Sequence, residues 1–170
     1  MSADEAKINS VILGDSPTDP AKMEVLLASV TNKFSEQRME MLEGIGLDVI
    51  ALEPEAIALA RALTPSNNTS AQMIIDMGEY ATDIVITSSG APRLVRSIPT
   101  GGQSLLKAAM QNLNIDENQA RQFVYKFGLD SSKLEGQINR ALLSTVEVVS
   151  SEVQKSIKFF NSRYPNTPLA

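Results

Sequence analysis

The amino-acid sequence predicts a layered α/β fold, both from its pattern of apolar residues and from its composition. Short runs rich in Val, Ile and Leu alternate with longer segments whose apolar residues recur every three or four positions, as in strands that are followed by helices. Of the 170 residues, 43% are apolar but only 5% are aromatic, and Trp is absent. We therefore expect a core of aliphatic side chains packed between a sheet and helices.

Residues 1–65 are expected to form a first, small α/β unit. Residues 1–22 carry little pattern, whereas the run Met23–Val30 is dense in Val and Leu, which predicts a buried strand. Thr31-Asn32 offers an N-cap for a helix over residues 33–43. The residues expected to face the core from this helix are Phe34, Met41, Leu42 and Ile45.

The rest of this unit is expected to return to a strand and then to a helix. A strand is predicted over residues 47–52, and Pro54 suits the first turn of an Ala-rich helix that extends to Leu63. From Thr64 to Ser70 the composition changes to Thr, Pro, Ser and Asn, whose side chains bond to nearby backbone and favour loops. This loop is the predicted boundary with a second unit over residues 71–170.

The second unit is expected to begin with a β-meander. Residues 72–76, 82–88 and 92–98 have the composition of three strands, and a short turn over residues 77–81 joins the first two. Pro99 to Gly102 then closes the meander and opens a helix.

Helices are predicted for the remainder of the chain. The first extends to Leu113, and Asp116 with Gln119 resembles a capping box for the next, which Gly128 ends. Apolar residues at steps of three or four from Leu134 to Phe160 predict one long amphipathic helix, or two. At ~1.5 Å per residue it would span roughly 43 Å and should bridge two packed units. No further strand follows it, so we expect a partial α/β layer.

Charge and residue types exclude several classes of function. Asp and Glu outnumber Lys and Arg by 20 to 15 without any basic stripe, so nucleic acid is not an expected partner. The chain has neither Cys nor His, which excludes thiolate nucleophiles, Cys-ligated zinc and the commonest near-neutral general base. No stretch approaches the ~20 apolar residues that span a bilayer. We therefore expect a cytoplasmic protein that reaches a membrane only through a partner.

The segment from Asp76 to Thr82 is the strongest candidate for chemistry. A carboxylate ends one strand, Gly78 lets the backbone turn sharply, and a hydroxyl begins the returning strand. Backbone N–H groups in such a turn can hold phosphate oxygens, Thr82 can add a donor, and Asp76 can hold Mg²⁺ through water. Gly101 and Gly102 stand at a helix start, where an anion can also bind. The same residues also fit an ordinary tight hairpin, which is common.

In this order, the segments resemble the PilM family of type IV pilus assembly proteins, which are actin-like relatives of the cell-division protein FtsA. Residues 23–28, Gly46-Leu47 and residues 52–59 are similar to the small inserted subdomain of that family. Residues 75–82 resemble its second phosphate segment, and residues 96–102 resemble the strand end and paired glycines that follow it.

The resemblance implies part of an actin-like (ribonuclease H-like) ATPase fold, with residues 1–65 as the inserted subdomain and residues 71–170 as half of the core. It also implies a scaffold peripheral to the inner membrane. Such a scaffold docks the amino-terminal cytoplasmic peptide of an inner-membrane pilus protein and connects it to other platform or motor proteins. ATP and Mg²⁺ are expected only with a full-length protein. We predict no catalytic residue and no cofactor that this chain requires.

Departures from the family pattern weigh against catalysis. No first phosphate segment precedes the inserted subdomain and no adenosine-binding glycine pair follows the long helix, so we expect an incomplete cleft. Glu79 and Tyr80 stand where the family usually has small residues, and a carboxylate there would repel phosphate. Arg121 and Val124 stand where relatives often carry Glu and Lys. A scaffold is the leading hypothesis. The alternatives are an ATP-binding or ATP-hydrolysing actin-like protein that uses this turn, and an FtsA-like division protein.

Overall fold

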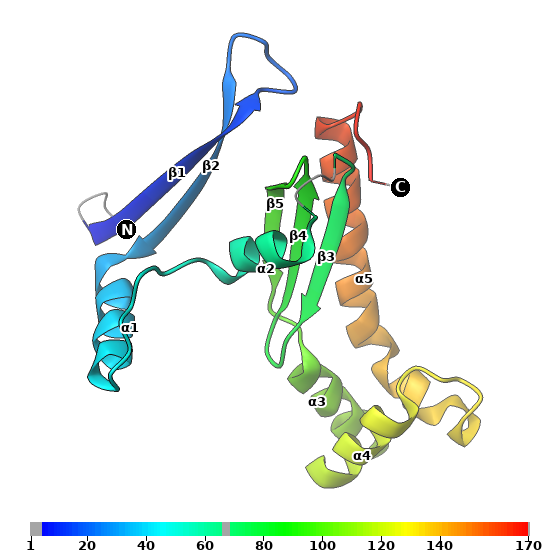
Figure 1. Ribbon diagram of the computed structural model, residues 1–170. Coiled ribbons are helices and arrows are strands. Elements are labelled where there is room, and N and C mark those ends of the chain that lie inside the picture. The colour runs from blue at the N-terminus through cyan, green and yellow to red at the C-terminus, as the bar shows by residue number, and fades with distance from the viewer. Residues whose placement is uncertain (1–4, 66–68, 170) are drawn as a thin grey trace.

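The described part of the chain forms two small antiparallel sheets, each from strands that are neighbours in the sequence (Figure 1). The computed structural model describes residues 5–65 and 69–169. The second sheet is the predicted meander, in the order β3-β4-β5. Its strands are β3 (Gln72–Met77), β4 (Thr82–Ser88) and β5 (Ala91–Ile98). These bounds match the predicted strands to within a residue, because each strand pairs with its sequence neighbour and its turns carry the expected residues.

The first sheet is a hairpin that the sequence predicted only in part. β1 (Ala6–Asp15) forms where no element was predicted, and it pairs along its whole length with β2 (Met23–Thr31). The predicted strand is confirmed as β2, but the prediction that it is buried is wrong. Four of its apolar side chains are exposed: Met23, Val25, Leu27 and Val30. A run of apolar residues indicates a buried strand only where layers cover both faces of the sheet, and most of this hairpin extends away from the body of the chain in Figure 1.

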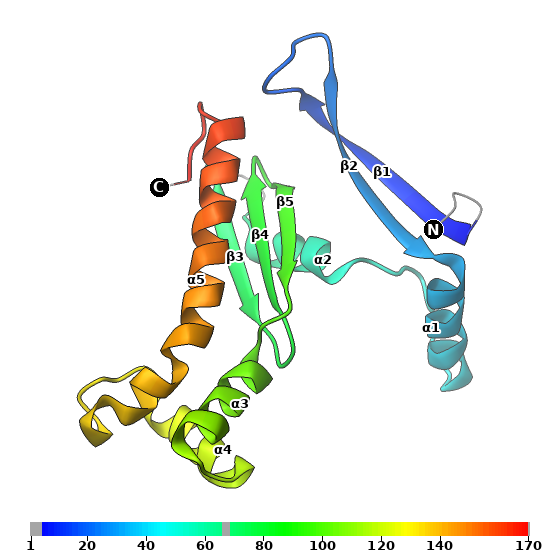
Figure 2. The same cartoon turned by 180° about the vertical axis from the view of Figure 1, so that it is seen from behind.

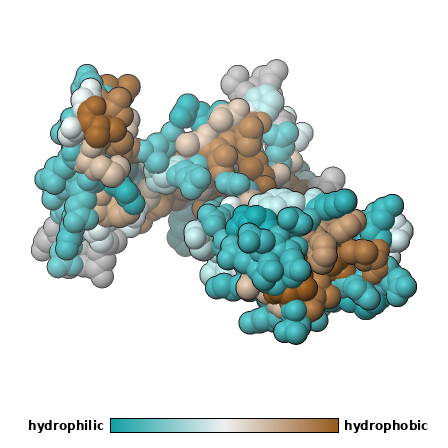
Figure 3. All heavy atoms as spheres, turned by 90° about the horizontal axis from the view of Figure 1, so that it is seen from below, coloured by the Kyte–Doolittle hydropathy of each residue, from teal (hydrophilic) through white to brown (hydrophobic). Residues whose placement is uncertain are grey.

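Helix α1 (Asn32–Gly44) begins at the predicted cap, where the Thr31 hydroxyl accepts a hydrogen bond from the Phe34 N–H at 3.2 Å. Its predicted buried stripe is wrong. Phe34 and Met41 are exposed, Ile45 just beyond the helix is 73% exposed, and Leu42 is only half-buried. The helix extends from the end of β2 and no second layer covers it, so apolar surface remains on this part of the molecule (left in Figure 3).

The segment between α1 and the next helix has no regular structure, so the strand predicted over residues 47–52 is wrong. Its Ile50 is 93% exposed. A segment with the composition of a strand does not form one where no neighbouring strand edge is present to accept and donate backbone hydrogen bonds. The predicted Ala-rich helix follows as α2 (Glu55–Leu63), with Pro54 at its N-cap. The loop predicted over residues 64–70 is partly described, because residues 66–68 lie outside the described residues.

The main core lies between the meander and the helices on its two faces (Figures 1 and 2). Ile84 and Ile86 of β4 pack with Val149 and Phe160 of α5 (Gln137–Arg163). Successive strand residues point to opposite faces, so the alternate residues of β4 face α2. One of them, Thr87, shares a hydrogen bond with Thr64 at the end of α2. The central strand is therefore covered on both sides, as its continuous apolar run requires.

A second core forms at the other end of α5. Helices α3 (Gly102–Leu113) and α4 (Glu117–Phe127) pack there around Ala109, Ala120, Ile138 and Leu142. The predicted capping box of α4 is present, and the long amphipathic segment is a short 3₁₀ turn, Leu134–Gly136, followed by the single helix α5. That helix bridges two packed clusters, as its length predicted. Among the described residues, no helix is long and apolar enough to cross a membrane.

Candidate functional site

The structure brings the predicted turn and the paired glycines into direct contact. The turn closes when the Gly78 N–H donates to the Ala81 carbonyl oxygen at 2.9 Å. The first N–H groups of α3 then donate to this turn, Gly102 to the Gly78 oxygen at 3.0 Å and Gln103 to the Glu79 oxygen at 2.8 Å. The hairpin between β3 and β4 is thus bonded by its backbone to the start of α3.

Gly101 is the point of closest approach between these two segments. A Cβ atom at this residue would lie 2.5 Å from the Gly78 oxygen and 2.8 Å from the Ala81 nitrogen. Its backbone is extended, which any residue adopts, so the need for glycine comes from the lack of space and not from a left-handed conformation. A Cβ at Gly102 would lie 3.8 Å from the nearest atom, which is an ordinary contact.

The two polar side chains of the motif take different positions. Thr82 is fully buried, and its hydroxyl donates to the Thr100 carbonyl oxygen at 2.6 Å, which uses its one proton inside the protein. Asp76 is half-buried and lies directly opposite Asp83 in the β3–β4 pair, so both carboxylates share one face of the sheet.

The remaining donors fit a phosphate poorly. The first N–H groups of α3 are occupied by the turn, and the Glu79 carboxylate accepts a hydrogen bond from the Gln103 side chain at 2.9 Å. A negative side chain therefore already stands at the end of α3 that would attract an anion. No group of three or more acidic side chains in the described part of the chain could hold a metal ion. Binding of phosphate or Mg²⁺ by these five residues stays a prediction.

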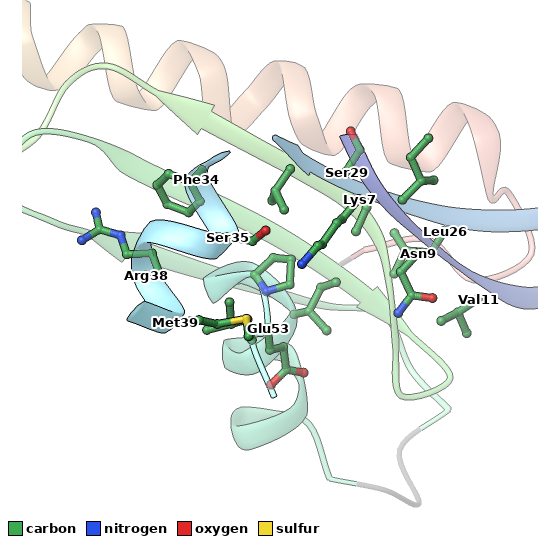
Figure 4. Close-up of a pocket in the computed structure, with 16 residues that line it drawn as sticks. Lys7, Asn9, Val11, Leu26, Ser29, Phe34, Ser35, Arg38, Met39 and Glu53 are labelled. Carbon is green, nitrogen blue, oxygen red and sulfur yellow. The ribbon is translucent and has the colours of Figure 1, made fainter. Parts of the chain in front are cut away.

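A larger concave surface lies elsewhere, between the hairpin, α1 and the start of α2. This groove has a volume of about 590 Å³ and is mostly apolar. The hairpin contributes the cross-strand pair Val11 and Leu26, α1 contributes Phe34 and Met39, and α2 contributes Ile57. Figure 4 shows the labelled side chains of the two strands and of α1 gathered around one hollow. Sequence analysis missed the groove because it depends on β1, which was not predicted.

Two cations that line the groove form no ion pair among the described residues. Lys7 of β1 points into the hollow, and Arg38 of α1 stacks over the Phe34 ring with its guanidinium carbon 5.1 Å from the ring centre (Figure 4). Glu53 is the one acid among the described residues that line the groove. It is already paired with Arg61 at 2.7 Å, and this hydrogen bond lowers the pKa of Glu53. An apolar floor with polar and charged groups at its margins suits a short peptide segment.

A smaller cavity of about 380 Å³ lies next to the turn, between Met77, Leu105, Val124 and Val149. Its lining is almost wholly apolar, so it offers no charge to a phosphate. We assign it no role in nucleotide binding.

Comparison with known proteins supplies the context for both surfaces. The model of the family described as type IV pilus assembly protein PilM matches residues 1–169. The search of the curated proteins finds no match. Among solved structures, the chain is similar to a PilM-PilN type IV pilus biogenesis complex, with a TM-score of 0.72 and 18% identity over 95% of this chain and 47% of that chain.

Two other similar structures come from different systems. MreB5 of Spiroplasma citri bound to ADP has a TM-score of 0.61 and 20% identity, over 74% of this chain and 47% of that one. The ethanolamine utilization protein EutJ from Carboxydothermus hydrogenoformans has a TM-score of 0.59 and 24% identity, over 76% of this chain and 44% of that one. The chain thus spans about half the length of these structures. At such identities the likeness shows the fold, which is part of an actin-like α/β fold, as predicted.

Proposed function

Because the chain belongs to the PilM family of type IV pilus assembly proteins, which the match over residues 1–169 shows, we propose that it acts as a scaffold without catalytic activity. In this proposal it docks the amino-terminal cytoplasmic peptide of an inner-membrane pilus protein. It links that protein to other platform or motor proteins on the cytoplasmic side, and reaches the membrane only through the partner.

The observation that carries this proposal is the groove of about 590 Å³ between the hairpin, α1 and α2. Its apolar lining would be costly to leave in water, and its size matches a few side chains of a bound segment. The similarity to a PilM-PilN complex supports a pilus protein as the occupant. The absence of His and Cys from the sequence supports a role that needs no nucleophile–base pair.

Binding of fluorescent peptides tests the proposal. The peptides would cover the amino-terminal cytoplasmic segment of an inner-membrane pilus protein from the same organism, and fluorescence anisotropy would report binding. Ala28→Arg places a long charged side chain among the residues that line the groove and should abolish binding. Ile12→Arg is the matched control, because Ile12 is exposed on the other face of the same hairpin. Equal affinity of both variants would refute the groove as the docking site.

Nucleotide binding at the turn is the second candidate function. The similarity to MreB5 structures bound to ADP and to AMPPNP supports it, as does the position of Asp76 in the last two residues of β3, two positions before Gly78. If Mg-ATP binds there, it should raise the melting temperature. Asp76→Ala should then abolish the increase, while Asp48→Ala, at an exposed site outside the turn, should preserve it. An unchanged melting temperature for the wild type would exclude this candidate.

A further inference from the structure

A buried carboxylate connects the hairpin to the sheet and to α5. The side chain of Glu24, in β2, is only 9% exposed. It forms an ion pair with Arg93 of β5 at 2.6 Å and a longer one with Arg163 of α5 at 3.3 Å. The hydroxyl of Tyr164, immediately after α5, also donates to it.

Arg93 extends this connection to both strands of the hairpin. It is itself only 12% exposed, and its second terminal nitrogen donates to the carbonyl oxygen of Leu13 in β1 at 3.0 Å. A buried charge is tolerated only when it is paired and hydrogen-bonded, so Glu24 and Arg93 each require the other in place. The pair therefore favours one orientation of the hairpin relative to β5 and α5.

The position of Glu24 in β2 relates this contact to the groove. Alternate residues of a strand point to the same side, and Leu26, Ala28 and Val30, which follow Glu24 at steps of two, line the groove. The opposite wall is formed by Leu52, Glu53 and Pro54, which directly precede α2, and by Ile57 within α2, the helix that packs on the sheet. Between the two walls, the chain runs through residues 47–51, which have no regular structure.

The groove is thus bounded by two bodies that are joined by an irregular segment at one end and by the Glu24 contacts at the other. We infer that Glu24 is a positioning residue for the docking groove: its contacts with Arg93, Arg163 and Tyr164 hold the hairpin at the angle at which Leu26, Ala28 and Val30 face α2. This inference rests on the proposed function of the groove. Without those contacts, the hairpin would turn about residues 47–51, and the groove would lose its shape.

Distance measurements by electron spin resonance test the orientation without any ligand. The chain has no Cys, so Ser10→Cys and Ser151→Cys introduce the only two label sites. Both residues are exposed, one on the face of β1 away from the groove and the other on α5. Labels on the otherwise unaltered chain should give one narrow distance distribution. Glu24→Gln should give a broad distribution at a temperature where circular dichroism shows the chain still folded.

Two further variants keep the test decisive. Asp19→Asn removes an exposed ion pair with Lys22 in the loop of the same hairpin and should leave the distribution narrow. Tyr164→Phe removes a single hydrogen bond to Glu24 and should broaden it partially even if Glu24→Gln does not fold. A distribution that stays narrow in both Glu24→Gln and Tyr164→Phe would overturn the inference.

Peptide binding then relates orientation to function. When only a fraction of molecules has the competent groove, the apparent affinity falls by that fraction, so Glu24→Gln should weaken binding by about tenfold if one molecule in ten remains competent. Affinity equal to that of the wild type would contradict a positioning role. Failure of every peptide to bind the unaltered chain would count against the proposed function, while the distance distributions would still decide whether Glu24 orients the hairpin.

Discussion

Replacing Gly101 with alanine tests the packing of the turn over residues 78–81 against the start of α3. The new methyl group would lie 2.5 Å from the Gly78 oxygen, and within 2.8 Å of the backbone of Glu79 and Ala81. All three neighbours are backbone atoms, which cannot rotate away as the end of a side chain could. The turn and α3 must therefore separate, and their two connecting hydrogen bonds must lengthen or break.

The expected loss of stability follows from these contacts. Overpacking of a close contact costs about 1–3 kcal/mol, and each backbone hydrogen bond contributes about 1 kcal/mol net. Alanine recovers about 0.5 kcal/mol by restricting the unfolded chain. We expect the free energy of unfolding to fall by about 3 kcal/mol, measured by urea denaturation with circular dichroism.

Gly102→Ala is the matched control, because its methyl group would meet nothing closer than 3.8 Å. Gly102 is the first residue of α3, where alanine is also the better helix former. Its free energy of unfolding should equal or exceed that of the wild type. Equal urea midpoints for the two variants would refute the close packing of the turn on α3.

Three further predictions concern the main core, a helix cap and the buried carboxylate. Phe160 is fully buried in the main core, so Phe160→Ala should lower the free energy of unfolding by about 3–5 kcal/mol in urea, and a wild-type midpoint would contradict that core. Asp116→Ala removes the capping box of α4 and should cost about 1 kcal/mol in the same assay, whereas no change would show that the cap contributes nothing. Burial raises the pKa of Glu24, but hydrogen bonds from Tyr164 and Arg93 outweigh burial and hold this pKa below its ordinary value of 4.5. Its stabilising effect is therefore complete above pH 4.5 and is lost as the pH falls through the folded-state pKa, so the stability difference between wild type and Glu24→Gln should shrink below pH 4.5. A difference that stays constant between about pH 7 and pH 3 would contradict this.

The elements that sequence analysis predicted well are those determined by local interactions. The meander strands are joined by short turns, and α4 has its capping box within four residues, so neighbouring side chains were sufficient evidence. The predictions that failed concern residues whose state depends on distant segments. The run 47–52 has strand composition but no edge to pair with, and the apolar side chains of α1 have no second layer to cover them.

The same distinction applies to the sites. The proximity of Gly78 and Gly101 was predictable, because the two strands between them, β4 and β5, form a hairpin that returns the chain to the start of β4. Their close backbone contact was not predictable, since the sequence does not reveal that the first N–H groups of α3 donate to the carbonyl oxygens of the turn. The contacts of Glu24 join residues that are 69 to 140 positions apart, and no periodicity in the sequence points to such a pair.

Docking of a pilus peptide in the groove is the central claim, and photo-crosslinking tests it most directly. A photo-reactive amino acid would replace Met39, which lines the groove, or Met41, which is exposed on the same helix and does not line it. After illumination with the partner's amino-terminal cytoplasmic peptide, mass spectrometry would identify the linked residues. The account predicts crosslinks from position 39 and none from position 41. Crosslinks from position 41 alone, or from neither position, would contradict it.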